Sequence, residues 1–242
     1  MKRTLMLLLG LSVLLSVLFG CTVGTVVLNR PTRKTVTQTL GGDAPTVTEY
    51  AYTYNSEGQL LLAETSHGAR VEYIYENGRL VREVEVSRTA DPDRVTEYIY
   101  DDDGRLAEKR LPTGVVCRYL YSDDGSLRRE EYVREGSDTP SEVHEYTYSE
   151  DGELLSEVVS AYGDTDTWEY CYDENGRREG GTRTYRSAFG GVTVAEIAYT
   201  YSADGLLVKE EYRTLSSEGS MTLLFEVTVT EYFDYKSFAL TQ

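Results

Sequence analysis

The sequence predicts an all-β protein that folds as an antiparallel meander of β-hairpins. Tyrosine is abundant, since the 242 residues contain 21 Tyr beside 5 Phe and 1 Trp, and Tyr, Val and Thr favour strands over helices. A segment built on Tyr-x-Tyr occurs seven times, and each copy runs into a turn that closes on Gly, which is typical of hairpins. Seven hairpins give about 14 strands, which we expect to form a curved or partly closed sheet.

Each repeat carries the same turn chemistry. In six copies Asn, Asp or Ser follows the second tyrosine and Gly stands four places after it, which suits a type I turn closed by a left-handed Gly. The second copy is one residue shorter and leaves Asn77-Gly78 as a two-residue type I′ loop. The copies are YTYNSEGQL at Tyr52, YIYENGRL at Tyr73, YIYDDDGRL at Tyr98, YLYSDDGSL at Tyr119, YTYSEDGEL at Tyr146, YCYDENGRR at Tyr170 and YTYSADGLL at Tyr199.

The segments between the hairpins predict how the hairpins join. Short links at 66–69 and 111–114 favour pairing of consecutive hairpins into one meander. Residues 22–43 are expected to be a tether plus one leading strand, and YFDY at Tyr232 resembles a decayed eighth copy that would cap the sheet. Longer polar links are expected to be surface loops, namely SRTADPDR at Ser87, REGSDTPSE at Arg134, AYGDTDT at Ala161 and RSAFGGV at Arg186.

Side-chain alternation predicts two different faces. The tyrosines share one face with Tyr50, Val71, Thr96, Cys117, His144, Trp168 and Ile197, and with the leucines that follow each turn, Leu60, Leu80, Leu106, Leu127, Leu154 and Leu207, where Arg178 is the exception. The other face carries Glu72, Glu97, Arg118, Glu145 and Glu169. We expect the Tyr/Leu face to be the core; the alternative is a sheet wet on both faces with its tyrosines exposed for binding.

The same alternation predicts the state of two cysteines. Cys117 falls on the tyrosine face, whereas Cys171 lies between two tyrosines and points the opposite way. Two repeats separate them, so we expect two free thiols, Cys117 buried and Cys171 more accessible.

These motifs resemble the YD repeats of the RHS family, whose unit is also Tyr, a spacer, Tyr, an Asp-like residue and a Gly turn. The resemblance covers roughly Tyr50 to Arg213. In that family the repeats wind as an antiparallel ribbon into a shell around a toxic C-terminal domain. The present sequence ends at Gln242, soon after the last Gly turn, and shows no match to the family's core-associated segment. The resemblance therefore implies the ribbon architecture and a curved or partly closed sheet, without the cargo role.

The first residues resemble a bacterial lipoprotein signal. Lys2 and Arg3 precede an apolar run that closes on Leu18-Phe19-Gly20-Cys21, similar to a lipobox, although Phe19 replaces the usual small residue. The resemblance implies a diacylglycerol on the Cys21 thiol and cleavage before Cys21. The alternatives are an ordinary signal peptide or an uncleaved anchor. The expected organisation is a signal peptide at 1–20, the lipidated Cys21 and tether at 21–45, and one repeat domain at 46–242.

Charge and motif content limit the chemistry. The net charge of −17 becomes −19 when Lys2 and Arg3 are removed, which disfavours nucleic acid. His67 and His144 are the only histidines, so no zinc site is expected. DDDG at Asp101, SDDG at Ser122 and DTDTW at Asp164 do not have the spacing of a calcium loop. We therefore expect no cofactor, no metal and no catalytic residue, and the sequence does not locate a binding site.

Two classes of function fit these features. The first is a membrane-anchored extracytoplasmic lipoprotein of the bacterial cell envelope, attached through Cys21, that acts as a non-enzymatic binding or structural module for a glycan or protein partner. Tyr and Trp suit such contacts. The alternative is a cell-envelope or glycan-acting hydrolase with paired carboxylates about 5 to 10 Å apart in a cleft.

Overall fold

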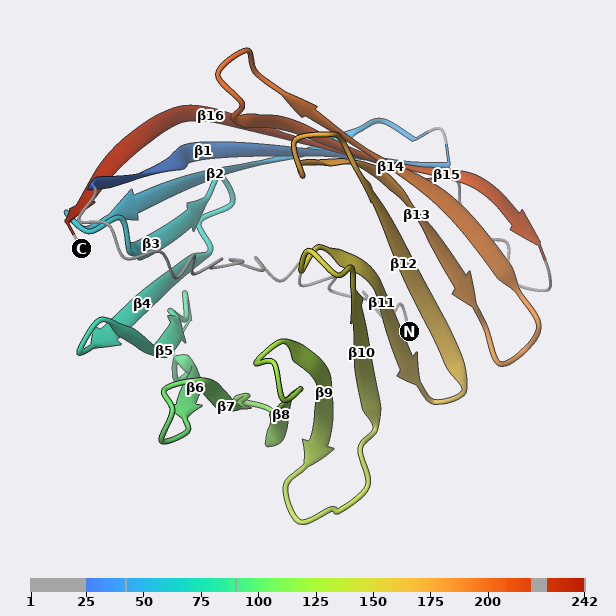
Figure 1. The fold of residues 1–242 in the computed structure, drawn as a ribbon, viewed down its shortest axis with the longest axis horizontal. Coiled ribbons are helices and arrows are strands. Elements are labelled where there is room, and N and C mark those ends of the chain that lie inside the picture. The colour runs from blue at the N-terminus through green and yellow to red at the C-terminus, as the bar shows by residue number, and fades with distance from the viewer. Residues whose placement is uncertain (1–24, 42, 90, 219–225, 242) are drawn as a thin grey trace.

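A computed structural model of the chain shows a closed β-barrel of sixteen antiparallel strands (Figure 1). The structure describes residues 25–41, 43–89, 91–218 and 226–241. Strands adjacent in sequence pair around the ring, and the first and last strands pair to close it. The prediction of an all-β antiparallel meander is confirmed, and the sheet closes completely. Within the described ranges there is no helix with the length and apolar character needed to cross a membrane.

The seven repeats supply fourteen of the strands, as pairs that flank each Gly turn, and one further strand stands at either end. The bounds are β1 Thr25–Leu40, β2 Thr46–Tyr54, β3 Leu60–Thr65, β4 Arg70–Glu76, β5 Arg79–Glu85, β6 Arg94–Tyr100, β7 Leu106–Arg110 and β8 Val115–Tyr121. They continue with β9 Leu127–Arg134, β10 Glu142–Tyr148, β11 Leu154–Ala161, β12 Asp164–Tyr172, β13 Arg178–Arg186, β14 Val192–Tyr201, β15 Leu207–Glu218 and β16 Glu226–Thr241.

The hairpin turns have the predicted geometry. In the third repeat the Gly104 amide donates to the Asp101 carbonyl at 2.9 Å, and the Asp101 amide donates to the Arg105 carbonyl at 2.8 Å. Gly104 has φ 80°, the left-handed conformation that Gly adopts without strain. The shorter turn has φ 50° at Asn77 and 79° at Gly78, as a type I′ loop requires. Local sequence therefore determines both turn types.

One predicted loop is wrong. The segment AYGDTDT at Ala161 was expected to be a surface loop, but β11 continues to Ala161 and β12 begins at Asp164. The connection is only Tyr162 and Gly163, with φ 51° and 88°. Backbone pairing of 165–167 with both β11 and β13, and of Asp164 with β11, outweighs the polar composition of this stretch. The other three long links, after β5, β9 and β13, lie between strands as expected.

The pairing of β1 with β16 closes the barrel. The register runs from Thr25↔Thr241 to Leu40↔Glu226, the longest ladder in the sheet, and β1 also pairs with β2. Most of residues 22–43, expected to be a tether plus one leading strand, is thus strand β1. The expected leading strand is present and takes up most of this segment. The YFDY segment resembles a repeat in structure as well, because the Tyr235 hydroxyl donates to the Leu207 carbonyl. It belongs to the wall rather than to a cap.

The register confirms the predicted opposition of tyrosine and leucine. The second tyrosine of each repeat pairs with the residue after the turn, as in Tyr54↔Leu60 and Tyr201↔Leu207, and a β-bulge lies beside each pair. The tyrosine face is half-buried, so its environment lies between the two alternatives, a dry core and a wet sheet. Among the described residues the buried hydrophobic side chains are Cys117, Val133, Ala195, Ile197 and Phe238.

The second tyrosines join neighbouring hairpins. Tyr100 donates its hydroxyl to the Leu80 carbonyl at 2.8 Å, and Tyr121 donates to the Leu106 carbonyl at 2.9 Å. The arginine that follows the turn glycine covers the next tyrosine ring, with the Arg105 guanidinium carbon 5.0 Å from the Tyr121 centroid. A hydrogen bond contributes about 1 kcal/mol and a cation–π contact about 0.5–1 kcal/mol. Where these contacts form, a repeat is therefore stabilised by the one before it.

The two described cysteines are free. Cys117 is buried and Cys171 is exposed. The predictions of two free thiols and of a buried Cys117 beside an accessible Cys171 are confirmed, because the two side chains lie on opposite faces of the wall.

Candidate functional site

The inner wall of the barrel carries a repeated pairing of tyrosine with a charged residue. The bulge beside each turn places the first tyrosine of a repeat opposite the residue three positions after the hairpin leucine. These pairs are Tyr73↔Glu83, Tyr98↔Lys109, Tyr119↔Glu130, Tyr146↔Glu157 and Tyr199↔Glu210. Burial is the main cause that raises the pKa of Tyr73 to about 12, and it also raises the pKa of Tyr98, Tyr119 and Tyr146. These hydroxyls therefore remain donors at neutral pH.

The tyrosine face is the concave face of the wall. Trp168 on β12 and Tyr212 on β15 are separated by two strands, which correspond to about 14 Å of wall at the usual spacing. Their ring centroids nevertheless lie only 6.3 Å apart. The small, buried Ala195 on β14, one of the two strands between them, leaves the space that lets the rings approach. The alternation of side chains then directs every first tyrosine towards the interior.

A hydrogen-bond network centres on Glu130 of β9. Its Oε2 accepts from the Tyr132 hydroxyl at 3.0 Å, and its Oε1 accepts from the Tyr146 hydroxyl at 3.0 Å. The Cys117 thiol lies 3.5 Å from Oε2. Burial, followed by the charge of Glu130, raises the pKa of Cys117 to about 12, so this thiol is not a nucleophile.

His144 continues the network to β11. Its Nε2 lies 2.8 Å from Glu142 Oε1, and its Nδ1 lies 2.9 Å from Glu157 Oε1. A neutral imidazole has one N–H, so only the imidazolium can donate to both carboxylates. Burial opposes this charge, but the hydrogen bonds to Glu142 and Glu157 outweigh it and raise the pKa of His144 to about 9.

Trp168 and Arg183 extend the same row of side chains. Trp168 is the cross-strand partner of Glu157 on one side and of Arg183 on the other. The Arg183 guanidinium carbon lies 4.8 Å from the Trp168 ring centroid and 5.6 Å from that of Tyr212. Arg183 Nη2 pairs with Asp166 Oδ2 at 2.7 Å. The guanidinium is thereby held between two aromatic rings.

Together these residues form a row of alternating acidic, aromatic and basic groups across β9 to β15. We call this row the inner belt; its members are Glu130, Tyr146, Glu157, Trp168, Arg183 and Tyr212. The carboxylate of Glu157 keeps 23% of its side-chain surface exposed and Arg183 keeps 18%. The belt is therefore fixed by mutual contacts but remains partly accessible to solvent, with hydrogen-bonding groups beside aromatic faces.

The residues singled out in the sequence have different fates. Cys21 lies outside the described residues. His67 lies in the exposed turn between β3 and β4, away from the inner belt. His144 contacts the belt through Glu157. Asp101 and Asp124 serve as turn acceptors, since each binds a backbone amide of its own turn, at 2.8 and 2.9 Å. In the part of the chain that the structure describes, no group of three or more His, Cys, Asp or Glu is placed to hold a metal ion.

The inner-belt carboxylates were not recognised in the sequence. Their signal is a spacing of Leu-x-x-Glu, as in Leu127 to Glu130 and Leu154 to Glu157. Because the bulge shifts the register by one residue, this spacing brings the glutamate back to the tyrosine face. Counting alternate residues through the turn without the bulge places it on the wrong face.

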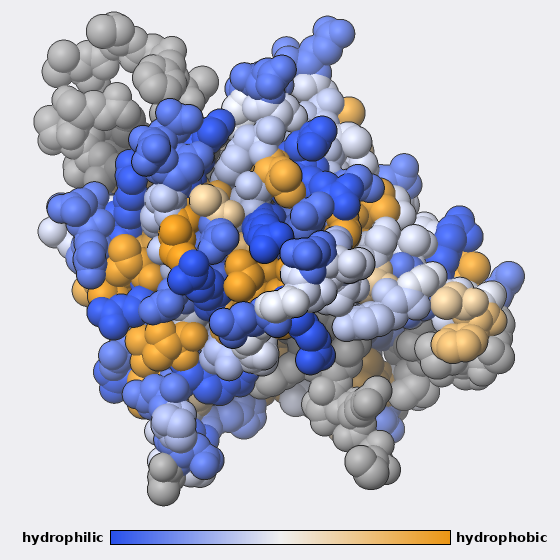
Figure 2. All heavy atoms as spheres, turned by 90° about the horizontal axis from the view of Figure 1, so that it is seen from below, coloured by the Kyte–Doolittle hydropathy of each residue, from blue (hydrophilic) through white to orange (hydrophobic). Residues whose placement is uncertain are grey.

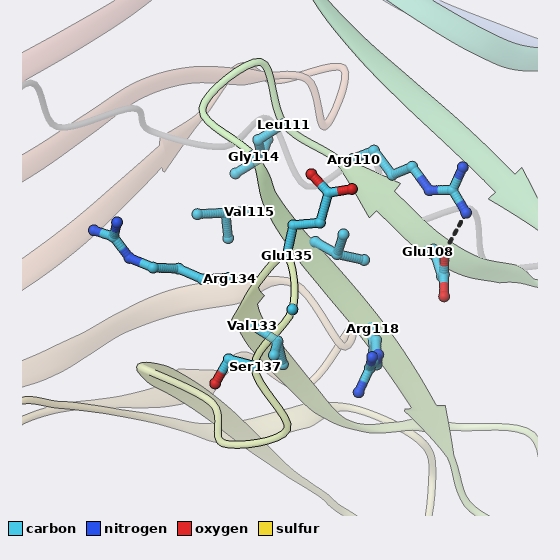
Figure 3. Close-up of a pocket in the computed structure, with 12 residues that line it drawn as sticks. Glu108, Arg110, Leu111, Gly114, Val115, Arg118, Val133, Arg134, Glu135 and Ser137 are labelled. Atoms are coloured by element: carbon cyan, nitrogen blue, oxygen red, sulfur yellow. Dashed lines mark hydrogen bonds and ion pairs between the residues drawn. The ribbon is translucent and has the colours of Figure 1, made fainter.

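A separate pocket of about 440 Å³ lies on the outer wall (Figure 3). Val116 and Val133, which pair across β8 and β9, line it together with Arg118 and the loop after β9. Arg110 Nη2 forms an ion pair with Glu108 Oε2 at 3.1 Å. This pocket is on the opposite face of the wall from the inner belt, and the two share no lining residue.

The fold and the belt define a closed antiparallel β-barrel with an aromatic and charged inner face. No protein-family model and no curated protein matches the chain. Among solved structures it is similar to a porin-like protein from Bacteroides uniformis ATCC 8492, with 11% identity over 86% of this chain and 97% of that chain and a TM-score of 0.50. This likeness concerns the fold alone.

Two further structural likenesses are weaker. A porin-like protein from Bacteroides vulgatus ATCC 8482 matches at 13% identity, over 84% of this chain and 98% of that chain, with a TM-score of 0.33. The structure of TcdB2-TccC3-Cdc42 matches at 16% identity over 75% of this chain, with a TM-score of 0.37. The present chain covers only 10% of that chain.

Proposed function

We propose that the protein is an extracytoplasmic lipoprotein of the bacterial cell envelope, with YD-type repeats, that binds a glycan at the inner belt without cleaving it. The observation that carries the binding role is the belt itself. Trp168 lies between the acidic Glu157 and the basic Arg183, and all three are fixed by cross-strand pairing. Aromatic faces stack on sugar rings, while carboxylates and guanidinium groups accept from and donate to hydroxyls.

The outer wall supports anchoring through Cys21 instead of burial of the wall in lipid. Arg129 pairs with Glu131 at 2.9 Å and with Glu145 at 3.1 Å, all on outward positions of β9 and β10. On the face seen in Figure 2 the apolar side chains form small clusters within a hydrophilic surface. A lipid-facing wall needs a continuous apolar band about 25 Å tall. We therefore propose that the barrel stands in water and contacts the membrane through the lipid on Cys21.

One observation favours the hydrolase alternative. The Tyr146 hydroxyl lies 3.0 Å from Glu130 Oε1 and 3.5 Å from Glu157 Oε1. These two oxygens are thus at most about 6.5 Å apart, an upper bound that is compatible with the carboxylate separation of retaining glycosidases, about 5 to 5.5 Å. Both glutamates, however, act as acceptors from tyrosine or from His144. Neither is placed to donate a proton to a leaving group, so binding without cleavage is the better supported function.

The single tryptophan gives a direct assay of the belt. Trp168 is the only Trp of the chain, so its fluorescence reports on this site alone. The probes are soluble peptidoglycan fragments and a panel of neutral and acidic polysaccharides. We expect a saturable fluorescence change with at least one glycan and no new reducing ends. Glu157→Gln should weaken binding about tenfold, the loss of one charged hydrogen bond.

A matched control lies on the same hairpin. Glu145 is a glutamate on the outer face of β10, so Glu145→Gln should leave the affinity unchanged. If no probe changes the fluorescence of Trp168, or if both variants bind equally, the binding site is not the inner belt. Release of reducing ends that stops in Glu157→Gln would instead establish the hydrolase.

The anchor has an independent test. Radiolabelled fatty acid should be incorporated into the wild-type chain and not into Cys21→Ser. Equal labelling of both proteins would exclude lipidation at Cys21.

A further inference from the structure

Two aromatic side chains project from one rim of the barrel. Tyr162, in the turn between β11 and β12, is 80% exposed, and Phe189, in the loop between β13 and β14, is 84% exposed. They are the most exposed large hydrophobic residues that the structure describes. Both lie at the rim opposite the Gly turns of the repeats, and β12 pairs with β13 between them. We call them the aromatic rim pair.

The other turns of the chain show that neither turn conformation requires an aromatic residue. Ser187-Ala188-Phe189-Gly190 has the same turn hydrogen bond as Ser202-Ala203-Asp204-Gly205, from the Gly amide to the Ser carbonyl, at 2.9 Å in both. The two differ only in Phe189 where the other has Asp204. Tyr162-Gly163 likewise has the φ signs of Asn77-Gly78. Bulky residues adopt the φ of 51° seen at Tyr162 rarely, whereas Asn does so readily.

Asp164 braces the two tips against each other. Its Oδ1 accepts from the Ala188 amide at 2.8 Å, and its Oδ2 accepts from the Tyr185 hydroxyl at 2.5 Å. These bonds, first the one from Ala188, lower the pKa of Asp164, so the brace is present at neutral pH. The brace holds the two tips in fixed positions. Because the polar groups beside the tips hydrogen-bond to each other, the surface left for contact with a partner is mainly apolar.

The rim pair lies at the far end of the barrel from the start of β1. Leu28 pairs with Phe238, and the Phe238 ring packs against Gly58 in the first Gly turn. Thr25 therefore begins β1 at the Gly-turn rim. Cys21 precedes it by four residues, which span at most about 14 Å. If Cys21 is lipidated, as in the proposed function, the anchoring membrane lies at the Gly-turn rim and cannot be what the aromatic rim pair contacts.

We propose that Tyr162 and Phe189 form the docking surface for a protein partner with an apolar pocket, on the side of the barrel away from the anchor. Rigid aromatic side chains that insert into a pocket dominate the energy of many interfaces. A glycan site would need free hydrogen-bonding groups around the rings, and the adjacent Asp164 and Tyr185 already bind within the brace. This surface is separate from the inner belt.

The test uses site-specific photocrosslinking in the native host with the full chain. p-Benzoylphenylalanine is placed at position 162, at 189 or, as the control, at the exposed position 203 on the opposite rim. We expect one and the same host protein to be crosslinked from 162 and from 189 and not from 203. Lipid adducts alone, barrel-to-barrel adducts alone, or equal yields at all three positions would overturn the proposal.

Binding of the identified protein, purified, then measures the contribution of the aromatics. The double variant Tyr162→Asn with Phe189→Asp restores the residues found in the equivalent turns, so its melting temperature should not fall. The affinity of the double variant for the purified partner should fall tenfold or more. The control variant Asp204→Asn should keep the wild-type affinity and melting temperature. Equal affinities, or a lower melting temperature of the double variant, would refute the argument. If position 162 and position 189 both crosslink to this protein but Cys21 carries no acyl label, the docking surface stands and the proposed lipid anchor is wrong. Only the statement that the docking surface faces away from the membrane would then be withdrawn.

Discussion

Replacement of His144 by Gln should flatten the dependence of barrel stability on pH. The imidazolium donates to Glu142 at 2.8 Å and to Glu157 at 2.9 Å, and the side chain is only 15% exposed. Glutamine is uncharged and cannot donate at both of these positions. The variant therefore removes the one group of this network that changes charge near neutral pH.

The magnitude follows from the pKa of His144, about 9 in the folded barrel against about 6.5 in the unfolded chain. Because the folded state binds the proton more tightly, this stabilisation is complete below pH 6.5 and is lost as the pH rises to 9. A shift of this size corresponds to about 3 kcal/mol of unfolding free energy. The Cys117 thiol adds a second loss at higher pH, since burial raises its pKa to about 12.

Urea unfolding of both proteins between pH 5.5 and 9.5 checks this prediction. The difference in unfolding free energy between wild type and His144→Gln should shrink by about 3 kcal/mol across this range. The contribution of Cys117 is common to both proteins and cancels. A difference that stays constant with pH would show that folding does not raise the pKa of His144, and the reasoning from its two carboxylate partners would be refuted. NMR titration of the ring protons gives the same information for this one residue.

Three further outcomes follow from the repeats. Gly104→Val should lower the unfolding free energy by about 1 kcal/mol or more, because a β-branched residue is strained at φ 80°, whereas Asp102→Ala should have little effect in denaturant titration; equal effects would contradict the turn assignment. Tyr100→Phe should cost about 1 kcal/mol, since it removes the hydroxyl that binds a carbonyl of the preceding hairpin; an unchanged midpoint would show that this bond is not stabilising. In alkylation followed by mass spectrometry, Cys171 should react in the native protein and Cys117 only after unfolding; equal rates would contradict the assignment of the two faces.

Features set by neighbouring residues could be predicted from the sequence. Gly at a fixed distance from Tyr-x-Tyr determines the turn, the turn determines the register, and the register determines the face of Cys117 and Cys171. Closure could not be predicted in this way. It depends on strands with no Gly-turn repeat, whose contacts join residues such as Asn29 and Ser237, 208 positions apart.

The inner belt required information that no single strand contains. His144 meets Glu157 only because β10 pairs with β11 in a bulged register, and Trp168 meets Tyr212 only because the wall curves. The short Tyr162-Gly163 turn was missed for a different reason. The polar residues after it are typical of a loop, and only pairing on both sides makes them a strand.

The single seam between β1 and β16 has a consequence for the evolution of this architecture. Every other ladder joins strands that follow one another along the chain. Duplication of one hairpin would therefore insert two strands between existing neighbours without requiring a new distant partner. Since barrel diameter grows with strand number, the count of Tyr-x-Tyr copies sets the width. Relatives with six or eight copies would form narrower or wider barrels closed by the same two terminal strands.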